Sequence, residues 1–94
     1  MPDVPASACR PVTIRNRRGL HARASAKLVT LADGFQAGVI VDKDGTTASG
    51  RSIMSLMMLA AGPGDTILVR AEGPDAEDAV AAIAELVESK FGEE

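Results

Sequence analysis

The chain has 94 residues, of which 46% are apolar and 24% charged, and its formal net charge is −3. This length is typical of one small domain with little room for a deep substrate pocket, which disfavours a stand-alone enzyme. The negative charge and the lack of Trp and Tyr disfavour a nucleic-acid-binding protein, because such proteins use basic surfaces and aromatic stacking.

Cys9 is the only cysteine of the chain, which excludes an internal disulfide or a cysteine-rich zinc site and suits a reducing cytosol. Residues 1–8 lack the basic region and apolar core of a signal peptide. No apolar run approaches the roughly 18 residues of a membrane span. We therefore expect a cytoplasmic protein without membrane insertion. Residues 1–94 would form a single domain, in which residues 1–8 are a loose start.

The first half of the chain contains two predicted elements. A short strand is expected at about residues 10–15, where apolar and polar side chains alternate, and Asn16-Arg17-Arg18-Gly19 interrupts it. A helix is expected over about residues 21–32, because its apolar residues follow a helical period. Gly34 lies just past the end of this helix, where a left-handed cap is often required.

A hairpin and a short helix are expected next. Strands at about residues 36–41 and 46–49 are joined by Asp42-Lys43-Asp44-Gly45, a polar sequence typical of a tight turn. Ser52 then precedes an apolar segment at about residues 53–61, which is expected to be helical. Gly and Pro residues end this segment sharply.

The last predicted elements are a strand at about residues 66–71 and a helix at about residues 75–91. Glu77 and Asp78 fall in the first turn of that helix, where its dipole favours negative charge. The resulting order, β-α-β-β-α-β-α, predicts an α+β fold of the open-faced β-sandwich type. Three helices would cover one face of a four-stranded, mostly antiparallel sheet.

His21 is the only histidine of the chain, so a two-histidine metal motif cannot form, and we expect neither a metal site nor a cofactor. A serine nucleophile elbow of the Gly-x-Ser-x-Gly type does not occur either. His21 stands where a loop becomes a helix, and the free N–H groups of a first helical turn form an anion site. Because neutral imidazole is a nucleophile near physiological pH, this position suits covalent transfer of a phosphoryl group. The alternative is a surface histidine without a role.

Basic residues surround His21 in the sequence. Arg23 lies two residues after it and carries a planar guanidinium that suits phosphate, while Arg18 adds positive charge on the loop side. We expect a phosphate site made of Arg18, Arg23 and Ala22, which lies in the first helical turn. Each arginine alone is equally compatible with solvated surface charge, and the clustering around His21 is what favours a site.

Three segments at a common spacing resemble the HPr family, the histidine-containing phosphocarriers of the bacterial phosphoenolpyruvate-dependent phosphotransferase system. They are Gly19-Leu20-His21-Ala22-Arg23, Arg51-Ser52-Ile53-Met54 and Gly62-Pro63-Gly64-Asp65, and the resemblance covers about residues 10–91. It implies an open-faced β-sandwich and phosphorylation of His21 on Nδ1 by Enzyme I, which phosphoenolpyruvate charges. The phosphoryl group would pass to an EIIA-type protein, so the chain would be a carrier and not an enzyme.

The resemblance also implies roles for two other residues. Arg23 matches the family's active-site arginine, and Ser52 matches the serine that HPr kinase/phosphorylase modifies in some bacteria. Two positions depart from the common pattern: many members have Pro where this chain has Ala24, and Ser or Asn where it has Arg18. We expect Ala24 to change the rigidity of the helix start modestly, since Pro suits a first helical turn. The added charge of Arg18 leaves the transfer rate and the choice of partner open.

Ser52 has two compatible interpretations. Serine at a helix start commonly caps the helix, and we expect this role in any case. Phosphorylation would add roughly −1.5 to −2 charge there, which would repel acidic partner surfaces and leave the helix intact.

The segment after Ser52 is apolar nearly all round, and a short helix cannot bury every side. We therefore expect some of Ile53, Met54 and Met57 to be exposed. These three residues, with Leu20 of the His21 loop, are expected to form one docking face for partner proteins. The alternative is that these methionines belong to the core.

Other functions stay open. One is an HPr-like regulatory module that docks without phosphotransfer, against which His21 and Arg23 both count. Another is a small-molecule sensor on a similar scaffold, which would need converging polar groups away from His21. Sugar uptake and a nitrogen-related regulatory branch are both compatible with the sequence, and a monomer is expected.

Overall fold

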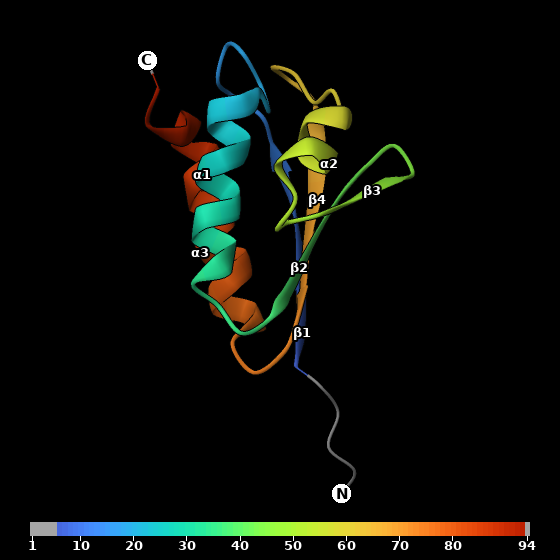
Figure 1. Ribbon diagram of the computed structural model, residues 1–94, viewed down its shortest axis with the longest axis vertical. Helices are drawn as coiled ribbons and strands as arrows, with labels where there is room; N and C mark the ends of the chain where they lie inside the picture. Colours follow the sequence, from blue (N-terminus) through green and yellow to red (C-terminus); the bar gives the residue numbers. More distant parts are fainter. Residues whose placement is uncertain (1–5, 94) are drawn as a thin grey trace, which may run out of the picture.

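The computed structural model describes residues 6–93 of the chain. The sheet has the strand order β1-β4-β2-β3, and each neighbouring pair is antiparallel. Helices α1, α2 and α3 pack on one face of this sheet, with α1 alongside α3 (Figure 1). The predicted open-faced β-sandwich is therefore confirmed. The elements are β1 (Ser7–Thr13), α1 (Ala22–Asp33), β2 (Gly38–Lys43), β3 (Thr46–Ser49), α2 (Ile53–Met58), β4 (Thr66–Glu72), α3 (Ala76–Glu88) and a 3-10 helix η1 (Lys90–Gly92).

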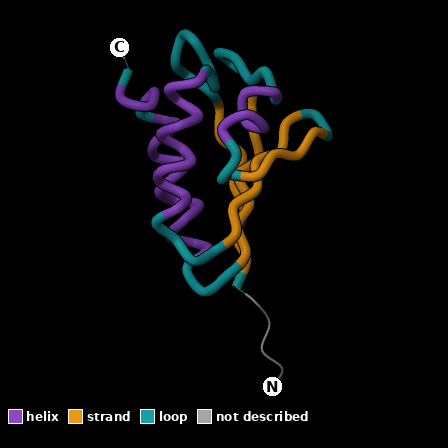
Figure 2. Tube along the Cα trace, in the orientation of Figure 1, coloured by secondary structure: helices purple, strands orange, loops and turns teal. Residues whose placement is uncertain are grey.

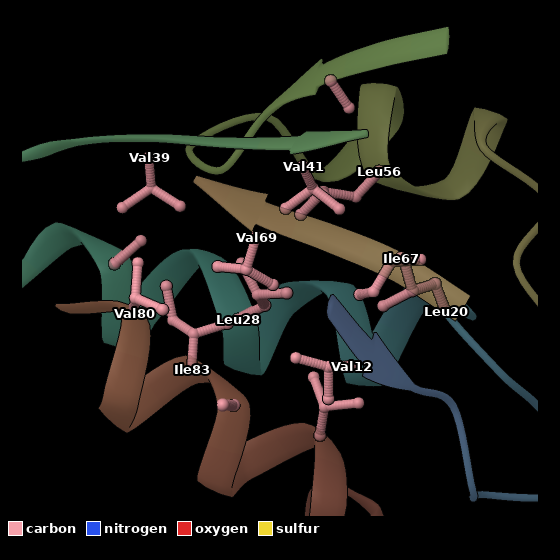
Figure 3. Packing of buried hydrophobic residues seen from close by; sticks show 14 of the residues in the cluster. Val12, Leu20, Leu28, Val39, Val41, Leu56, Ile67, Val69, Val80 and Ile83 are labelled. Atoms are coloured by element: carbon pink, nitrogen blue, oxygen red, sulfur yellow. The ribbon is translucent and has the colours of Figure 1, made fainter. Parts of the chain in front are cut away.

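The core lies between the sheet and the helices. Successive side chains of a strand point to opposite faces, so Ile67, Val69 and Ala71 of β4 all point inward and are buried. Leu28 of α1 and Ile83 of α3 are fully buried and meet this inner face (Figure 3). The period-2 pattern of β4 and the helical period of α1 and α3 thus bury one common apolar layer.

Strand β1 begins earlier than predicted. Ser7 pairs with Glu72 and Ala8 with Ala71 in the register of β4, so the expectation of a loose start is wrong for these two residues. Ala6 of that start is also bound, because its carbonyl accepts a hydrogen bond from the N–H of Gly73 at 2.8 Å, and residues 1–5 lie outside the described residues. Pro11 is compatible with β1 because this strand lies at the edge of the sheet, where a missing N–H is tolerated.

The hairpin and the first helix also differ in detail from the sequence expectation. β2 extends through Lys43, and the turn is confined to Asp44 and Gly45, whose φ values of 50° and 85° are typical of a two-residue hairpin turn. Gly34 has a φ of −80°, so the predicted left-handed cap of α1 is absent. Helix α1 begins at Ala22, and His21 is its N-cap.

The end of the chain departs most from the prediction. Helix α3 ends at Glu88, where the apolar spacing had predicted a helix to Phe91. Lys90 and Phe91 adopt positive φ values of 62° and 56°, which turn the chain back. Phe91 still reaches the core and is 1% exposed. This turn leads the C-terminal segment to the end of the molecule where α1 starts (Figure 2), and Glu93 of this segment lies beside His21.

Two loops are locked together at the same end of the molecule. The N–H of Leu20 donates to the carbonyl of Ala61 at 3.0 Å. Gly19 has a φ of +62°, and a Cβ placed on it would lie 2.1 Å from the carbonyl oxygen of Ala61. Only glycine fits this close approach, which fixes the path of the chain into His21.

Candidate functional site

His21 is held at the start of α1 by backbone contacts. Its carbonyl accepts the first helical hydrogen bond, from the N–H of Ser25 at 2.9 Å. The hydroxyl of Ser25 donates to the carbonyl of Leu20 at 3.1 Å. The first-turn N–H groups that follow His21 have no helical carbonyl to bind, so the positive end of the helix dipole lies beside the imidazole.

The imidazole of His21 contacts a carboxylate from the far end of the chain. Its Nε2 lies 2.6 Å from Oε2 of Glu93, and the two side chains are 14% and 20% exposed. A carboxylate accepts hydrogen bonds, so Nε2 is the donor and carries a proton. In a neutral ring the lone pair is then on Nδ1.

Asn16 supports the same carboxylate from a buried position. Its Nδ2 donates to Oε1 of Glu93 at 3.1 Å and to the carbonyl of Gly19 at 2.8 Å. Both partners are acceptors, so the amide nitrogen of Asn16, which donates, must be the atom that faces them. Asn16 therefore ties the loop before His21 to the C-terminal segment.

Electrostatics at this contact favour an ionised carboxylate. The hydrogen bond from His21 lowers the pKa of Glu93 below its ordinary value, and the hydrogen bond from Asn16 lowers it further. The charge of Lys27 acts in the same direction, more weakly. The Nζ of Lys27 also donates to the carbonyl of Phe91 at 2.6 Å, which anchors the segment that carries Glu93.

The predicted phosphate ligands flank His21 along the chain. Ala22 is the first residue of α1, and Arg23 is the second. Arg18 lies in the preceding loop, and the side chains of both arginines are exposed. Within residues 6–93, neither guanidinium is recorded in a hydrogen bond or an ion pair, so a role in binding phosphate stays a prediction.

Ser52 caps helix α2, as its position in the sequence predicted. Its hydroxyl oxygen accepts a hydrogen bond from the N–H of Ser55 at 3.2 Å and contacts the Ser55 hydroxyl at 2.9 Å. The residue is half-buried, with its backbone in an extended conformation.

Helix α2 exposes an apolar patch, which we define as Ile53, Met54, Met57 and Met58. Met54 and Met58 are 71% and 78% exposed, and the other two are each 39% exposed. The predicted exposure of the first three is confirmed, and Met58 joins them. Leu20 is only 4% exposed because it packs in the core, so its predicted side-chain contribution to the docking face is wrong.

The sequence did not indicate Glu93, Asn16 or Lys27 as site residues. The sequence around Asn16 predicts only a loop that interrupts a strand, and Glu93 follows the last apolar residue without any pattern. Asn16 and Glu93 are hydrogen-bonded to each other but lie 77 residues apart in the chain. Only the return of the chain after α3 brings them together.

Among the residues described, no group of three or more His, Cys, Asp or Glu side chains is placed to hold a metal ion. Over the same part of the chain, no helix combines the length and the apolar character needed to cross a membrane.

A family model described as the PTS HPr component phosphorylation site matches residues 8–89 of this chain. The chain belongs to the HPr family. The match confirms the resemblance that the His21 and Ser52 segments indicated.

Known members of the HPr family are similar over nearly the whole chain. The phosphocarrier protein HPr of Cupriavidus necator is 46% identical over 84 residues, which cover 89% of this chain and 94% of the relative. The phosphocarrier protein NPr of Shewanella violacea is 45% identical over 84 residues, 89% of this chain and 92% of the relative. The crystal structure of HPr-C-His from Thermoanaerobacter tengcongensis has a TM-score of 0.88 at 40% identity and covers 93% of this chain and 98% of its own.

Proposed function

We propose that this chain is a phosphocarrier of a phosphotransferase system. His21 accepts a phosphoryl group on Nδ1 from phospho-Enzyme I and passes it to an EIIA-type protein. The chain forms a covalent phosphohistidine, and its partners supply the catalysis. The observation that carries the proposal is the contact of His21 Nε2 with Glu93, which makes Nδ1 the free nucleophile at a helix start.

The start of α1 supports a phosphoryl group on this nitrogen. First-turn N–H groups and the helix dipole stabilise negative charge, and Ala22 and Arg23 are the first two residues of the helix. The exposed guanidinium of Arg23 supplies a planar set of donors that suits phosphate oxygens. Arg18 adds positive charge from the loop, which also favours the docking of acidic partner surfaces.

The apolar patch of α2 is the proposed docking face for Enzyme I and the EIIA-type protein. Its methionines are flexible and polarizable, so one surface adapts to two different partners in turn. The patch begins directly after Ser52, in the same short helix. Partner binding and any modification of Ser52 are therefore coupled.

Ser52 is the proposed regulatory phosphorylation site, with HPr kinase/phosphorylase as the enzyme that modifies it. A phosphoryl group at this helix start satisfies the local N–H groups, and its charge repels an acidic partner. Incubation with ATP and a cognate kinase tests this role by intact mass. A mass that stays unchanged while a known HPr is modified in the same assay rejects it.

The branch of the phosphotransferase system decides which EIIA is the acceptor. Relatives named HPr and NPr are 46% and 45% identical to this chain, so the transfer assay includes a sugar-type and a nitrogen-type EIIA. We further propose a cytoplasmic monomer, for which sedimentation of the purified protein is the test of the oligomeric state.

Intact mass tests the carrier role directly. The protein is mixed with Enzyme I, magnesium and phosphoenolpyruvate beside the variant His21→Ala. The proposal predicts that only the native chain gains one acid-labile phosphate. If neither gains mass while a known HPr does, the chain instead acts as a regulatory module that docks without transfer.

A further inference from the structure

We propose that Glu93 is a positioning residue for phosphoryl transfer: its carboxylate holds a proton on Nε2 of His21 and so presents the Nδ1 lone pair to the donor. The inference rests on the proposed function, in which Nδ1 is the accepting atom. It starts from the 2.6 Å contact between Nε2 and Oε2 of Glu93. Glu93 lies beyond residues 8–89, the part of the chain that the family model matches.

The carboxylate is held in place from several directions. Asn16 Nδ2 donates to its second oxygen at 3.1 Å. Lys27 Nζ binds the carbonyl of Phe91 at 2.6 Å, and the side chain of Phe91 is buried in the core. The segment that carries Glu93 is thus anchored by the hydrogen bond from Lys27 and by the buried side chain of Phe91. The fold therefore holds the carboxylate of Glu93 beside His21.

The position of the proton decides which ring nitrogen reacts. A neutral imidazole has one protonated nitrogen and one nitrogen with a free lone pair, and the two forms exchange in water. A carboxylate bound at Nε2 stabilises the form with the proton there. The nucleophilic lone pair then stays on Nδ1.

The same contact serves both steps of the transfer without any movement of the proton. In acceptance, the Nδ1 lone pair forms a bond to phosphorus while the bond between phosphorus and the donor's leaving atom breaks. The ring keeps its Nε2 proton and becomes positively charged, and the Glu93 carboxylate stabilises that charge.

In donation, a nucleophilic atom of the acceptor protein forms a bond to phosphorus while the bond between Nδ1 and phosphorus breaks, and the electron pair of that bond returns to the ring. Because Nε2 still carries its proton, neutral imidazole leaves. Without that proton the leaving group would be imidazolate, a strong base and therefore a poor leaving group. In this role Glu93 acts through His21, because its carboxylate binds Nε2 and not the nitrogen that carries the phosphoryl group.

Nitrogen NMR of the unphosphorylated protein tests this role without any partner protein. The chain is labelled with ¹⁵N-histidine and compared with Glu93→Ala and with Glu88→Ala, a control for loss of an exposed glutamate at the end of α3. At a pH where the ring is neutral, the native chain and the control should show one tautomer, with a detectable Nε2 proton. Glu93→Ala should show averaged ring nitrogen shifts and lose that proton signal.

Circular dichroism verifies that Glu93→Ala is folded, and Asn16→Ala is a second variant that loosens the same carboxylate. Unchanged tautomer shifts in both variants would overturn the inference.

A rate assay with Enzyme I separates failure of the role of Glu93 from failure of the carrier role of the chain. We expect about tenfold slower phosphorylation of Glu93→Ala at saturating Enzyme I, with KM unchanged. If the native chain is phosphorylated and both variants match it in rate and tautomer, the carrier role stands and the role of Glu93 is rejected. If the native chain is not phosphorylated but the tautomer shifts, the carrier role fails instead.

Discussion

Asn16 and His21 bind the two oxygens of one carboxylate, that of Glu93. Asn16 Nδ2 donates to Oε1 at 3.1 Å, and His21 Nε2 lies 2.6 Å from Oε2. The two donors come from a loop and from a helix start, and the acceptor comes from the other end of the chain. This arrangement places a proton on Nε2 of His21 and connects the C-terminal segment to the start of α1.

Gly19→Ala should destabilise the protein by at least about 2 kcal/mol, because it combines a positive φ with a close approach to backbone. The added Cβ would lie 2.1 Å from the Ala61 carbonyl oxygen. Gly45→Ala is the matched control, since Gly45 also has a positive φ but no atom within 4 Å of its Cβ position. Urea unfolding measures both variants. Equal losses would show that the approach to Ala61 has no energetic weight.

Asn16→Ala should cost about 1–3 kcal/mol of unfolding free energy, because Asn16 is fully buried and the change leaves the Gly19 carbonyl without its donor. The loss should be smaller when Glu93→Ala is already present, since the two side chains interact directly. Urea unfolding of the two single variants and the double variant tests this. Strict additivity would mean that the hydrogen bond between them contributes nothing.

Acid should lower the stability of the folded protein partly through protonation of Glu93. Its pKa is lowered in the folded protein by His21, Asn16 and the charge of Lys27. A carboxyl whose folded pKa is depressed contributes stability above its unfolded pKa, and that contribution is lost as the pH falls through the folded value. The loss should therefore begin below the ordinary glutamate pKa of about 4.3.

Thermal unfolding between neutral and acid pH measures this effect. Glu93→Gln should show a shallower fall of the midpoint below that pH than the native chain, because the depressed carboxyl is absent. Glu88→Gln should behave like the native chain. The same fall in all three proteins would assign the acid sensitivity to other carboxyls, such as Asp42 and Asp75, whose pKa values are also lowered.

Arg23→Ala should slow phosphoryl transfer through His21 by about tenfold or more while leaving stability nearly unchanged. Arg23 is exposed in the first turn of α1, so its removal opens no cavity. Arg10→Ala, in the exposed part of β1, is the control for loss of one positive charge. If both variants slow transfer equally, only net charge matters, and Arg23 does not bind the phosphoryl group.

Met54→Asp should weaken binding of Enzyme I by about tenfold or more without unfolding the domain, because Met54 is 71% exposed in the apolar patch of α2. Ala81→Asp, on an exposed position of α3, is the control for an added acidic residue. Calorimetric titration with Enzyme I measures both. Native affinity in Met54→Asp would show that the patch is exposed without being a docking face.

The sequence was sufficient to predict those helices and strands in which the local residue pattern agrees with the pattern of burial. Ile67, Val69 and Ala71 alternate because β4 buries one face, and Ser52 caps α2 through a contact three residues away. The end of α3 was predicted wrongly because the spacing of Phe91 fits the apolar stripe of the helix, although the chain already turns at Lys90. A positive φ at Lys or Phe, unlike one at Asp44 of the hairpin turn, leaves no signal in the sequence.

The site could be predicted only where its residues are neighbours in the chain. His21 and Arg23 lie together at a helix start, and their types suffice to suggest phosphate chemistry. Glu93 lies 72 residues from His21, and its contact depends on the turn after α3. The prediction that Leu20 contributes to the docking face was wrong for a related reason. A position next to His21 in the sequence does not determine whether a side chain points to the core or to solvent.

The position of the phosphoryl group on the ring of His21 tests the central claim most directly. The ¹⁵N-histidine protein is phosphorylated by Enzyme I and phosphoenolpyruvate, and the coupling between ¹⁵N and ³¹P is recorded. We expect coupling to Nδ1 alone, with Nε2 still protonated beside Glu93. Coupling to Nε2 would contradict this mechanism, because the contact with Glu93 would have to break before that nitrogen could accept the phosphoryl group. A phosphate on another residue would contradict it as well, because His21 would then not be the carrier.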